Sequence, residues 1–121
     1  MGPAINRLKV RADFVRASAG IRRVTSGLTL ETCRTPEPAR GAGIRVGFTA
    51  TKKLGGAVDR NRAKRRLRAA AATVLPLFGS AGNDYVLVAR RDTLTRPFEQ
   101  LLDDLKSALR AAHAKLPKEH S

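Results

Sequence analysis

The sequence has little of what a secreted, membrane-spanning or metal-binding protein needs. Its 121 residues include a single cysteine, Cys33, which excludes an intramolecular disulfide and a cysteine-rich metal site. No apolar run approaches the length of a membrane span, and the N-terminus lacks the apolar segment of a signal peptide. We therefore expect a cytoplasmic protein in which Cys33 is a small apolar side chain of a strand, kept reduced.

Aromatic and acidic side chains are also scarce. Aromatic residues make up 4% of the chain, and 10 acidic residues stand against 24 basic ones, for a formal charge of +14. Residues 1–83 carry 17 basic and 4 acidic side chains, whereas residues 84–121 carry 7 and 6. The charge predicts an acidic partner that contacts mainly the first two thirds; RNA, DNA or an anionic membrane would each fit.

The residues that could form a catalytic or metal site are dispersed. Asp103 and Asp104 are neighbours, but on a helix their side chains point about 100° apart. Asp59 lies among arginines, and His113 and His120 lie near the C-terminal end, where we expect solvated histidines. No base accompanies a nucleophile. We therefore expect no catalytic residue, no metal ligand and no cofactor bound by the protein itself.

Residues 52–68 concentrate the positive charge. Nearly half of this stretch is basic, and Asp59 is its single acidic residue. Good helix formers continue to Pro76, and one narrow apolar stripe recurs at helical spacing, formed by Ala63, Leu67, Ala70, Ala71 and Val74. A solvated helix face is the alternative, but acidic partners three or four positions away are missing. We interpret the stretch as a nucleic-acid docking helix.

The rest of the chain reads as alternating short elements. Residues 1–11 are predicted to be an unpacked basic arm, and residues 114–121 a frayed tail. The patterns then predict a helix over 12–19 closed by Gly20 as a left-handed cap, strands within 21–34 and a hairpin connection over 35–43. A strand over 44–51, the basic helix ending at Pro76, a strand over 84–89 and a helix capped by Thr95 follow.

This order predicts one α+β domain over residues 1–121, a sandwich of αβββαβα type with its helices packed against one sheet. Its strands alternate as half-buried strands do: Leu28, Leu30 and Thr32 share one face, and Thr29, Glu31 and Cys33 the other. No linker is long enough to divide the chain.

The basic block also resembles a known family. It runs Lys52-Lys53-Leu-Gly-Gly-Ala-Val-Asp59-Arg60-Asn61-Arg62-Ala-Lys64-Arg65-Arg66-Leu-Arg68 and is similar to the signature of the bacterial ribonuclease P protein subunit. The resemblance covers roughly residues 7–110. It implies the fold of a domain of a small-subunit ribosomal protein, with an unusual left-handed strand–helix–strand crossover.

The resemblance also implies a function. Such a protein is one subunit of an endoribonuclease whose catalytic centre and Mg²⁺ ions belong to a partner RNA. It binds the 5′ leader of precursor tRNA and stabilises the catalytic RNA, with one protein expected per RNA. By position, the catalytic-RNA-binding residues would be Lys52, Lys53, Arg60, Asn61, Arg62, Lys64, Arg65 and Arg68.

The leader would bind in a cleft between the first helix and the sheet. Phe14 matches an aromatic of that cleft, and it could equally be a core anchor. Ser18 and Glu31 stand where the family commonly has further aromatics. Polar and phosphate contacts are therefore expected to replace stacking, from Arg11, Arg16, Arg45, Lys52 and Lys53. Because a carboxylate would repel the leader, Glu31 is expected to point elsewhere.

Three other functions fit parts of the sequence. A ribosomal or ribosome-assembly RNA-binding protein would share the charge, size and fold, and the RNA that copurifies would distinguish it. A DNA-binding architectural protein is disfavoured because no helix-turn-helix spacing is present. A membrane-surface helix would need bulky apolar residues opposite its charge, whereas this stripe is largely alanine.

Overall fold

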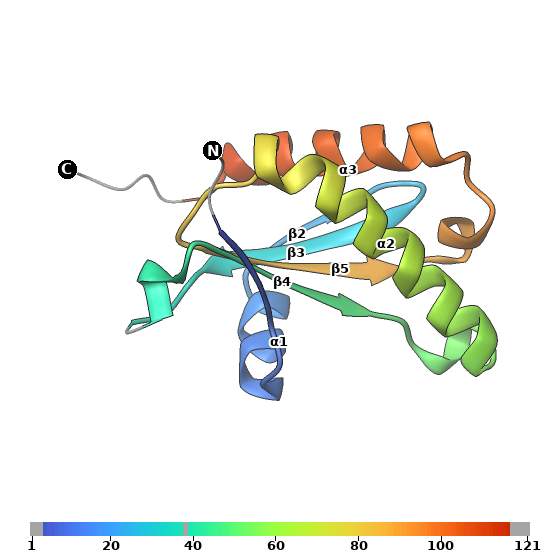
Figure 1. The fold of residues 1–121 in the computed structure, drawn as a ribbon, viewed down its shortest axis with the longest axis horizontal. Helices are drawn as coiled ribbons and strands as arrows, with labels where there is room; N and C mark the ends of the chain where they lie inside the picture. The colour runs from blue at the N-terminus through green and yellow to red at the C-terminus, as the bar shows by residue number, and fades with distance from the viewer. Residues whose placement is uncertain (1–3, 38, 117–121) are drawn as a thin grey trace.

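The computed structural model describes residues 4–37 and 39–116, and within them one five-stranded sheet organises the chain (Figure 1). The strands are β1 (Ile5–Arg7), β2 (Ile21–Val24), β3 (Leu28–Arg34), β4 (Ile44–Thr49) and β5 (Asn83–Ala89), in the spatial order β1-β4-β5-β3-β2. The helices are α1 (Arg11–Ser18), α2 (Ala57–Phe78) and α3 (Phe98–His113), with short 3₁₀ turns η1 (Ala39–Ala42), η2 (Lys52–Leu54) and η3 (Arg91–Leu94). The predicted α+β class is confirmed.

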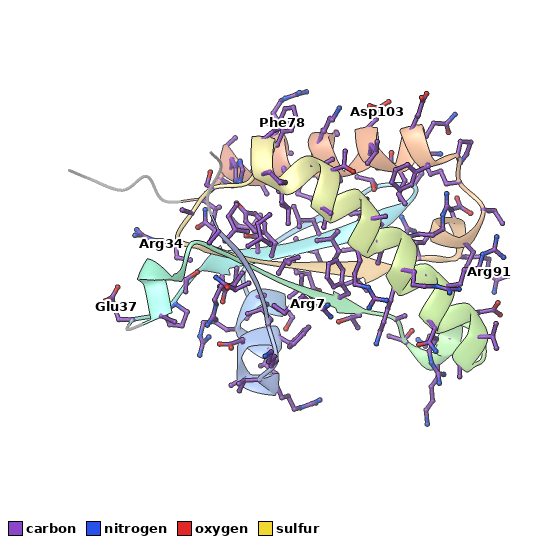
Figure 2. All side chains as sticks on the ribbon, in the orientation of Figure 1. Arg7, Arg34, Glu37, Phe78, Arg91 and Asp103 are labelled. Atoms are coloured by element: carbon purple, nitrogen blue, oxygen red, sulfur yellow. The ribbon has the colours of Figure 1, made fainter. Side chains whose placement is uncertain are left out.

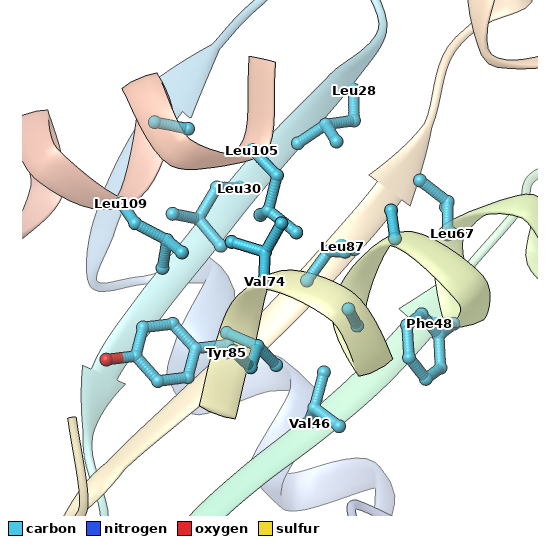
Figure 3. Packing of buried hydrophobic residues seen from close by; sticks show 14 of the residues in the cluster. Leu28, Leu30, Val46, Phe48, Leu67, Val74, Tyr85, Leu87, Leu105 and Leu109 are labelled. Carbon is cyan, nitrogen blue, oxygen red and sulfur yellow. The ribbon is translucent and has the colours of Figure 1, made fainter. Parts of the chain in front are cut away.

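The sheet is covered on both faces, which makes three layers rather than two. Helices α2 and α3 pack on one face, over a core that includes Leu30, Leu87 and Leu105 (Figure 3). Helix α1 packs on the other face, where Ala17 and Val86 are buried. The period-two alternation of β3 and β5 therefore sends successive side chains to two different cores, as a central strand requires.

The connection from β4 through α2 to β5 has the hand that the resemblance implied. Strands β4 and β5 are parallel neighbours, and α2 passes over one face between them. In Figure 1 β4 lies nearer the viewer than β5, both run to the right, and α2 returns above the sheet. This path is left-handed, opposite to nearly all such crossovers.

The prediction of an unpacked arm over residues 1–11 is wrong for the part that the structure describes. Residues Ile5–Arg7 form β1, which pairs in parallel with β4, and the Leu8 N–H donates to the Val46 carbonyl at 2.8 Å. Leu8 is only 5% exposed. The strand could not be predicted, because a strand this short shows almost no periodicity and the segment is rich in charge. Residues 1–3 lie outside the described residues.

The hairpin was also placed wrongly. Strands β2 and β3 form it, and the turn between them is held by the Thr25 hydroxyl, which donates to the Leu28 carbonyl at 2.7 Å. Strand β3 then pairs with β5, which follows only after β4 and α2 in the chain. The segment 35–43 therefore connects two strands that are not neighbours, which local turn chemistry cannot reveal.

Three helix boundaries differ from prediction. Gly20 does not have a positive φ; it is required because a Cβ there would lie 2.3 Å from the Thr32 carbonyl oxygen. Pro76 lies inside the last turn of α2, which continues to Phe78. Helix α3 is preceded by Pro97 as its N-cap, while Thr95 ends η3.

Of the expected tail, residues 114–116 are described and continue α3 through backbone hydrogen bonds; the others lie outside the described residues.

His113 is a further correction, because it is half-buried rather than a solvated histidine. Its Nε2 lies 2.7 Å from the Tyr85 hydroxyl, which accepts hydrogen bonds from Ser80 N–H and the Asn83 amide. The hydroxyl hydrogen is therefore assigned to the bond with Nε2, which must be unprotonated. Burial lowers the pKa of His113, so the neutral ring ties α3 to β5.

We expect this pair to make the stability depend on pH. With its pKa lower in the folded than in the unfolded chain, His113 takes up a proton more readily after unfolding. Its contribution should be complete above the ordinary pKa of 6.5 and be lost as the pH falls through the folded value. Urea unfolding at about pH 7.5 and about pH 5 should show a larger drop for the wild type than for His113→Gln; equal drops would contradict it.

Candidate nucleic-acid interface

The N-terminal part of α2 presents a row of exposed arginines that make no ion pair with the residues the structure describes. Gly55, with a φ of 146°, turns the chain into the helix, and Gly56 is its N-cap. Arg62, Arg65 and Arg68 are exposed, and in the described parts of the chain their side chains make no ion pair. Lys52 and Lys53 extend the row through η2. Cations without carboxylate partners are the pattern expected for a surface that binds phosphates.

The other predicted RNA contacts differ in exposure and in the hydrogen bonds that they make within the protein. Asn61 is exposed and Lys64 is partly exposed, whereas the Arg60 guanidinium donates to the Gly55 carbonyl at 3.2 Å and so also closes the turn before the helix. Arg66, which is not among the predicted RNA contacts, belongs to the fold: its two terminal nitrogens donate to the carbonyls of Thr93 and Arg96 and fasten α2 to the segment between β5 and α3.

The row continues onto residues that the sequence did not single out. Arg90 and Arg91 follow β5, and with Lys53 and Leu54 they line an open concavity of about 280 Å³. Figure 2 shows Arg91 at the end of the molecule where α2 begins. Because parallel strands β4 and β5 end at the same edge of the sheet, their following loops meet there. The sequence feature that could have identified these two residues is a pair of consecutive arginines directly after the strand predicted over 84–89.

The predicted cleft exists on the opposite face of the sheet from α2. It is an open cavity of about 430 Å³ between α1 and the sheet. Its lining residues are Lys9, Arg11, Phe14, Val15, Ser18, Glu31, Thr49 and Val86. The Phe14 ring lies directly over Gly47, where a Cβ would come within 2.5 Å of it. Phe14 is thus both a partial core residue and one wall of the cleft, so both interpretations of this residue hold structurally.

Glu31 faces the cleft, contrary to expectation. Residues 29, 31 and 33 of β3 share the face covered by α1, so the period of the strand aims the carboxylate there. Its nearest cation is Arg22, at 3.9 Å. Burial raises the pKa of Glu31, an effect that Arg22 offsets only in part. The lining of the cleft therefore combines the cations of Lys9 and Arg11 with the carboxylate of Glu31.

Two of the arginines expected at the leader are held by carboxylates. Arg45 donates to both oxygens of Asp84, at 2.8 and 2.7 Å, and lies 3.0 Å from Asp13. These partners raise the pKa of Arg45, the hydrogen bonds to Asp84 most strongly. Arg16 bonds Asp13 at 2.8 Å; burial opposes ionisation of Asp13, but these cations outweigh it and lower its pKa. Neither arginine lines the cleft, whereas Arg11 does.

The described residues contain no group of three or more His, Cys, Asp or Glu that could hold a metal ion. No described helix is long and apolar enough to cross a membrane. Cys33 packs beside Val86 below α1, and burial, with the nearby Asp84 charge, raises the pKa of its thiol to about 11. At neutral pH this thiol is protonated and a poor nucleophile.

A basic helix and a cleft between the first helix and the sheet are what the resemblance implied, and the structure adds that they lie on opposite faces. Comparison with known proteins decides the family. The family model described as Ribonuclease P matches residues 3–113. The chain belongs to the ribonuclease P protein family. This membership decides against the ribosomal, DNA-binding and membrane-surface alternatives.

Individual ribonuclease P proteins agree over nearly the whole chain. The ribonuclease P protein component of Ruegeria pomeroyi is 53% identical over 114 residues, which span 93% of this chain and 90% of that protein. That of Paramagnetospirillum magneticum is 46% identical over 127 residues, spanning 100% and 92%. The solved RNase P protein of Staphylococcus aureus superposes with a TM-score of 0.70 at 29% identity, covering 88% of this chain and 94% of the other.

Proposed function

We propose that this chain is the RNA-binding protein subunit of ribonuclease P and that, with a catalytic RNA, it removes the 5′ leader from precursor tRNA. Its relatives are ribonuclease P protein components, and ribonuclease P is an endoribonuclease in which the protein is a subunit. The observation that supports the role most directly is the exposed cation row of α2, which has no carboxylate partners among the described residues.

The two faces of the sheet suit two RNA contacts. In our proposal, the catalytic RNA binds the row formed by η2 and α2, through Lys52, Lys53, Arg60, Asn61, Arg62, Lys64, Arg65 and Arg68. The leader passes through the cleft beside α1, where Phe14, Ser18 and Arg11 form part of the wall. Arg45 acts there indirectly, by tying β4 to α1 through Asp13, and Arg16 pairs with the same carboxylate from within α1.

The chemistry of hydrolysis belongs to the RNA in this proposal. The described residues offer no carboxylate cluster for a two-metal site, so the required Mg²⁺ is expected on the partner RNA, and the protein needs no cofactor. One protein per RNA, acting in the cytoplasm, is the simplest arrangement for a chain with one basic helix.

Reconstitution tests the proposal. The protein alone is expected to leave precursor tRNA intact, because it has no hydrolytic constellation. Added to a bacterial ribonuclease P RNA at low Mg²⁺, it should release the leader and leave a 5′-phosphate on the tRNA, which gel analysis of end-labelled substrate would show. Cleavage at the same bond by RNA-free protein, or no stimulation of the RNA, would count against it.

The assignment of the leader to the cleft has a separate test, with two variants that should change leader affinity in opposite directions. Arg11→Ala removes a cation from the wall, whereas Glu31→Gln removes the only carboxylate that lines the cleft in the described chain. The ratio of precursor to mature tRNA affinity should fall about two- to fivefold for Arg11→Ala and rise about two- to fivefold for Glu31→Gln, the range of a partly exposed charge. Equal ratios for both variants and wild type would show that the leader lies elsewhere.

A further inference from the structure

A second cavity lies on the face of the sheet that carries α2, between that helix and β1. It is an open groove of about 180 Å³, and apolar side chains form most of its lining, among them Val46, Phe48 and Ala72. Its two polar lining residues are Arg7 on β1 and Arg68 on α2. The groove exists because residues 5–7 form an edge strand beside β4, and an unpacked arm would not form this wall.

The two arginines give the groove a specific chemistry. The Arg7 guanidinium carbon lies 5.1 Å from the centre of the Phe48 ring, over its face, and Arg68 on α2 is exposed. Among the residues that the structure describes, no carboxylate lines the groove. An apolar floor with guanidinium groups at the rim fits a ligand that is planar and apolar in one part and anionic in another, as a nucleotide is.

Position identifies the source of that ligand. Arg68 ends the cation row of α2 that we assign to the catalytic RNA, so an RNA bound along the row would reach the groove without leaving the surface. The groove is smaller than most small-molecule pockets, which suits one base rather than a larger ligand. Unpaired bases in RNA loops are commonly splayed out and stacked on aromatic or guanidinium planes.

We propose that this groove takes one unstacked nucleotide of the catalytic RNA. Its base packs against Ala72 and the planar guanidinium of Arg7, which covers the Phe48 ring, and its phosphate lies beside Arg68. The inference rests on the proposed function, because the ligand is part of the RNA that α2 binds. It adds an apolar, base-binding contact to a surface that is otherwise electrostatic.

The test fills the groove without removing charge. Ala72→Leu adds bulk at the groove wall, and Ala69→Leu is the matched control, because Ala69 is also exposed on α2 but does not line the groove. Leucine is nearly as good a helix former as alanine, so both variants should fold. Affinity for a bacterial ribonuclease P RNA should fall about five- to a hundredfold for Ala72→Leu, which corresponds to losing the stacking free energy of one base. The slope of log affinity against log salt should not change, because no charge is removed.

A second variant and a second readout identify the contact. Arg7→Lys keeps the charge but loses the planar group, and it should weaken binding with the same slope. Probing the bound RNA with dimethyl sulfate and a carbodiimide should reveal one nucleotide protected by wild type and Ala69→Leu but reactive with Ala72→Leu. If Ala72→Leu binds like Ala69→Leu, or weakens binding with no change at a single nucleotide, the proposal is overturned. Failure of the wild type to bind the RNA would instead overturn the proposed function.

Discussion

Replacing Arg45 with alanine is expected to lower the free energy of unfolding by about 3–5 kcal/mol, because it leaves the carboxylate of Asp84 buried and unpaired. Asp84 is 0% exposed, and Arg45 forms a two-pronged bond to it. The Thr35 hydroxyl also donates to this carboxylate, at 2.7 Å. A hydroxyl carries no charge and cannot replace the guanidinium as a counter-ion, so the substitution should lower the free energy of unfolding.

Two controls separate the buried charge from the loss of a long side chain. Arg16→Ala breaks a more exposed pair with Asp13, so it should cost no more than about 1 kcal/mol. Arg45→Met combined with Asp84→Asn removes both charges while keeping volume, and it should recover part of the loss. Urea unfolding of the three variants would measure this. A loss below about 1 kcal/mol for Arg45→Ala would mean that water reaches Asp84.

The role of Arg45 shows what a linear sequence cannot reveal about this site. As one more arginine in a basic chain, it was assigned to the leader. Its partners Asp13 and Asp84 lie far from it along the chain, one before it and one after it. Only the parallel pairing of β4 with β5 and the packing of α1 bring them together. Arg66 is a similar case, since its acceptors are backbone carbonyls of a distant loop.

Local patterns predicted other features well. The stripe of α2 is buried at every predicted position, because helical periodicity is a property of neighbouring residues. The alternation of β3 and β4 correctly separated the two faces of the sheet. It also contained the answer for Glu31: the period that puts Cys33 beneath α1 puts Glu31 there as well. The prediction that Glu31 avoids the cleft relied on charge repulsion, and it was wrong because the alternation of β3 determines which face the side chain occupies.

The elements that were missed are those specified by distant partners. Strand β1 is very short, and α1, β2 and β3 separate it in the chain from its partner β4. The pairing of β3 with β5 likewise spans β4 and α2. The pairing of β1 with β4 closes the groove beside α2, and α1 and α2 lie on opposite faces of the sheet. An RNA bound at α2 therefore leaves the α1 cleft open to a second strand.

Removing two cations from the α2 row should have the largest effect on RNA binding. Arg62→Ala combined with Arg65→Ala is expected to reduce affinity for a bacterial ribonuclease P RNA by at least about 100-fold at low salt, if each guanidinium forms a charge-assisted bond to a phosphate. The slope of log affinity against log salt should fall by about 1.4–1.8 units, since each neutralised phosphate contributes about 0.7–0.9.

The matched control is Arg110→Ala combined with Lys115→Ala, which removes the same two charges from exposed positions at the end of α3. Its slope should stay near the wild-type value, because net charge alone does not release counterions at a defined contact. Filter binding or fluorescence titration at several salt concentrations gives both quantities. Equal slopes for the two double variants would mean that the α2 cations are solvated in the complex, and the catalytic RNA would then have to bind another surface.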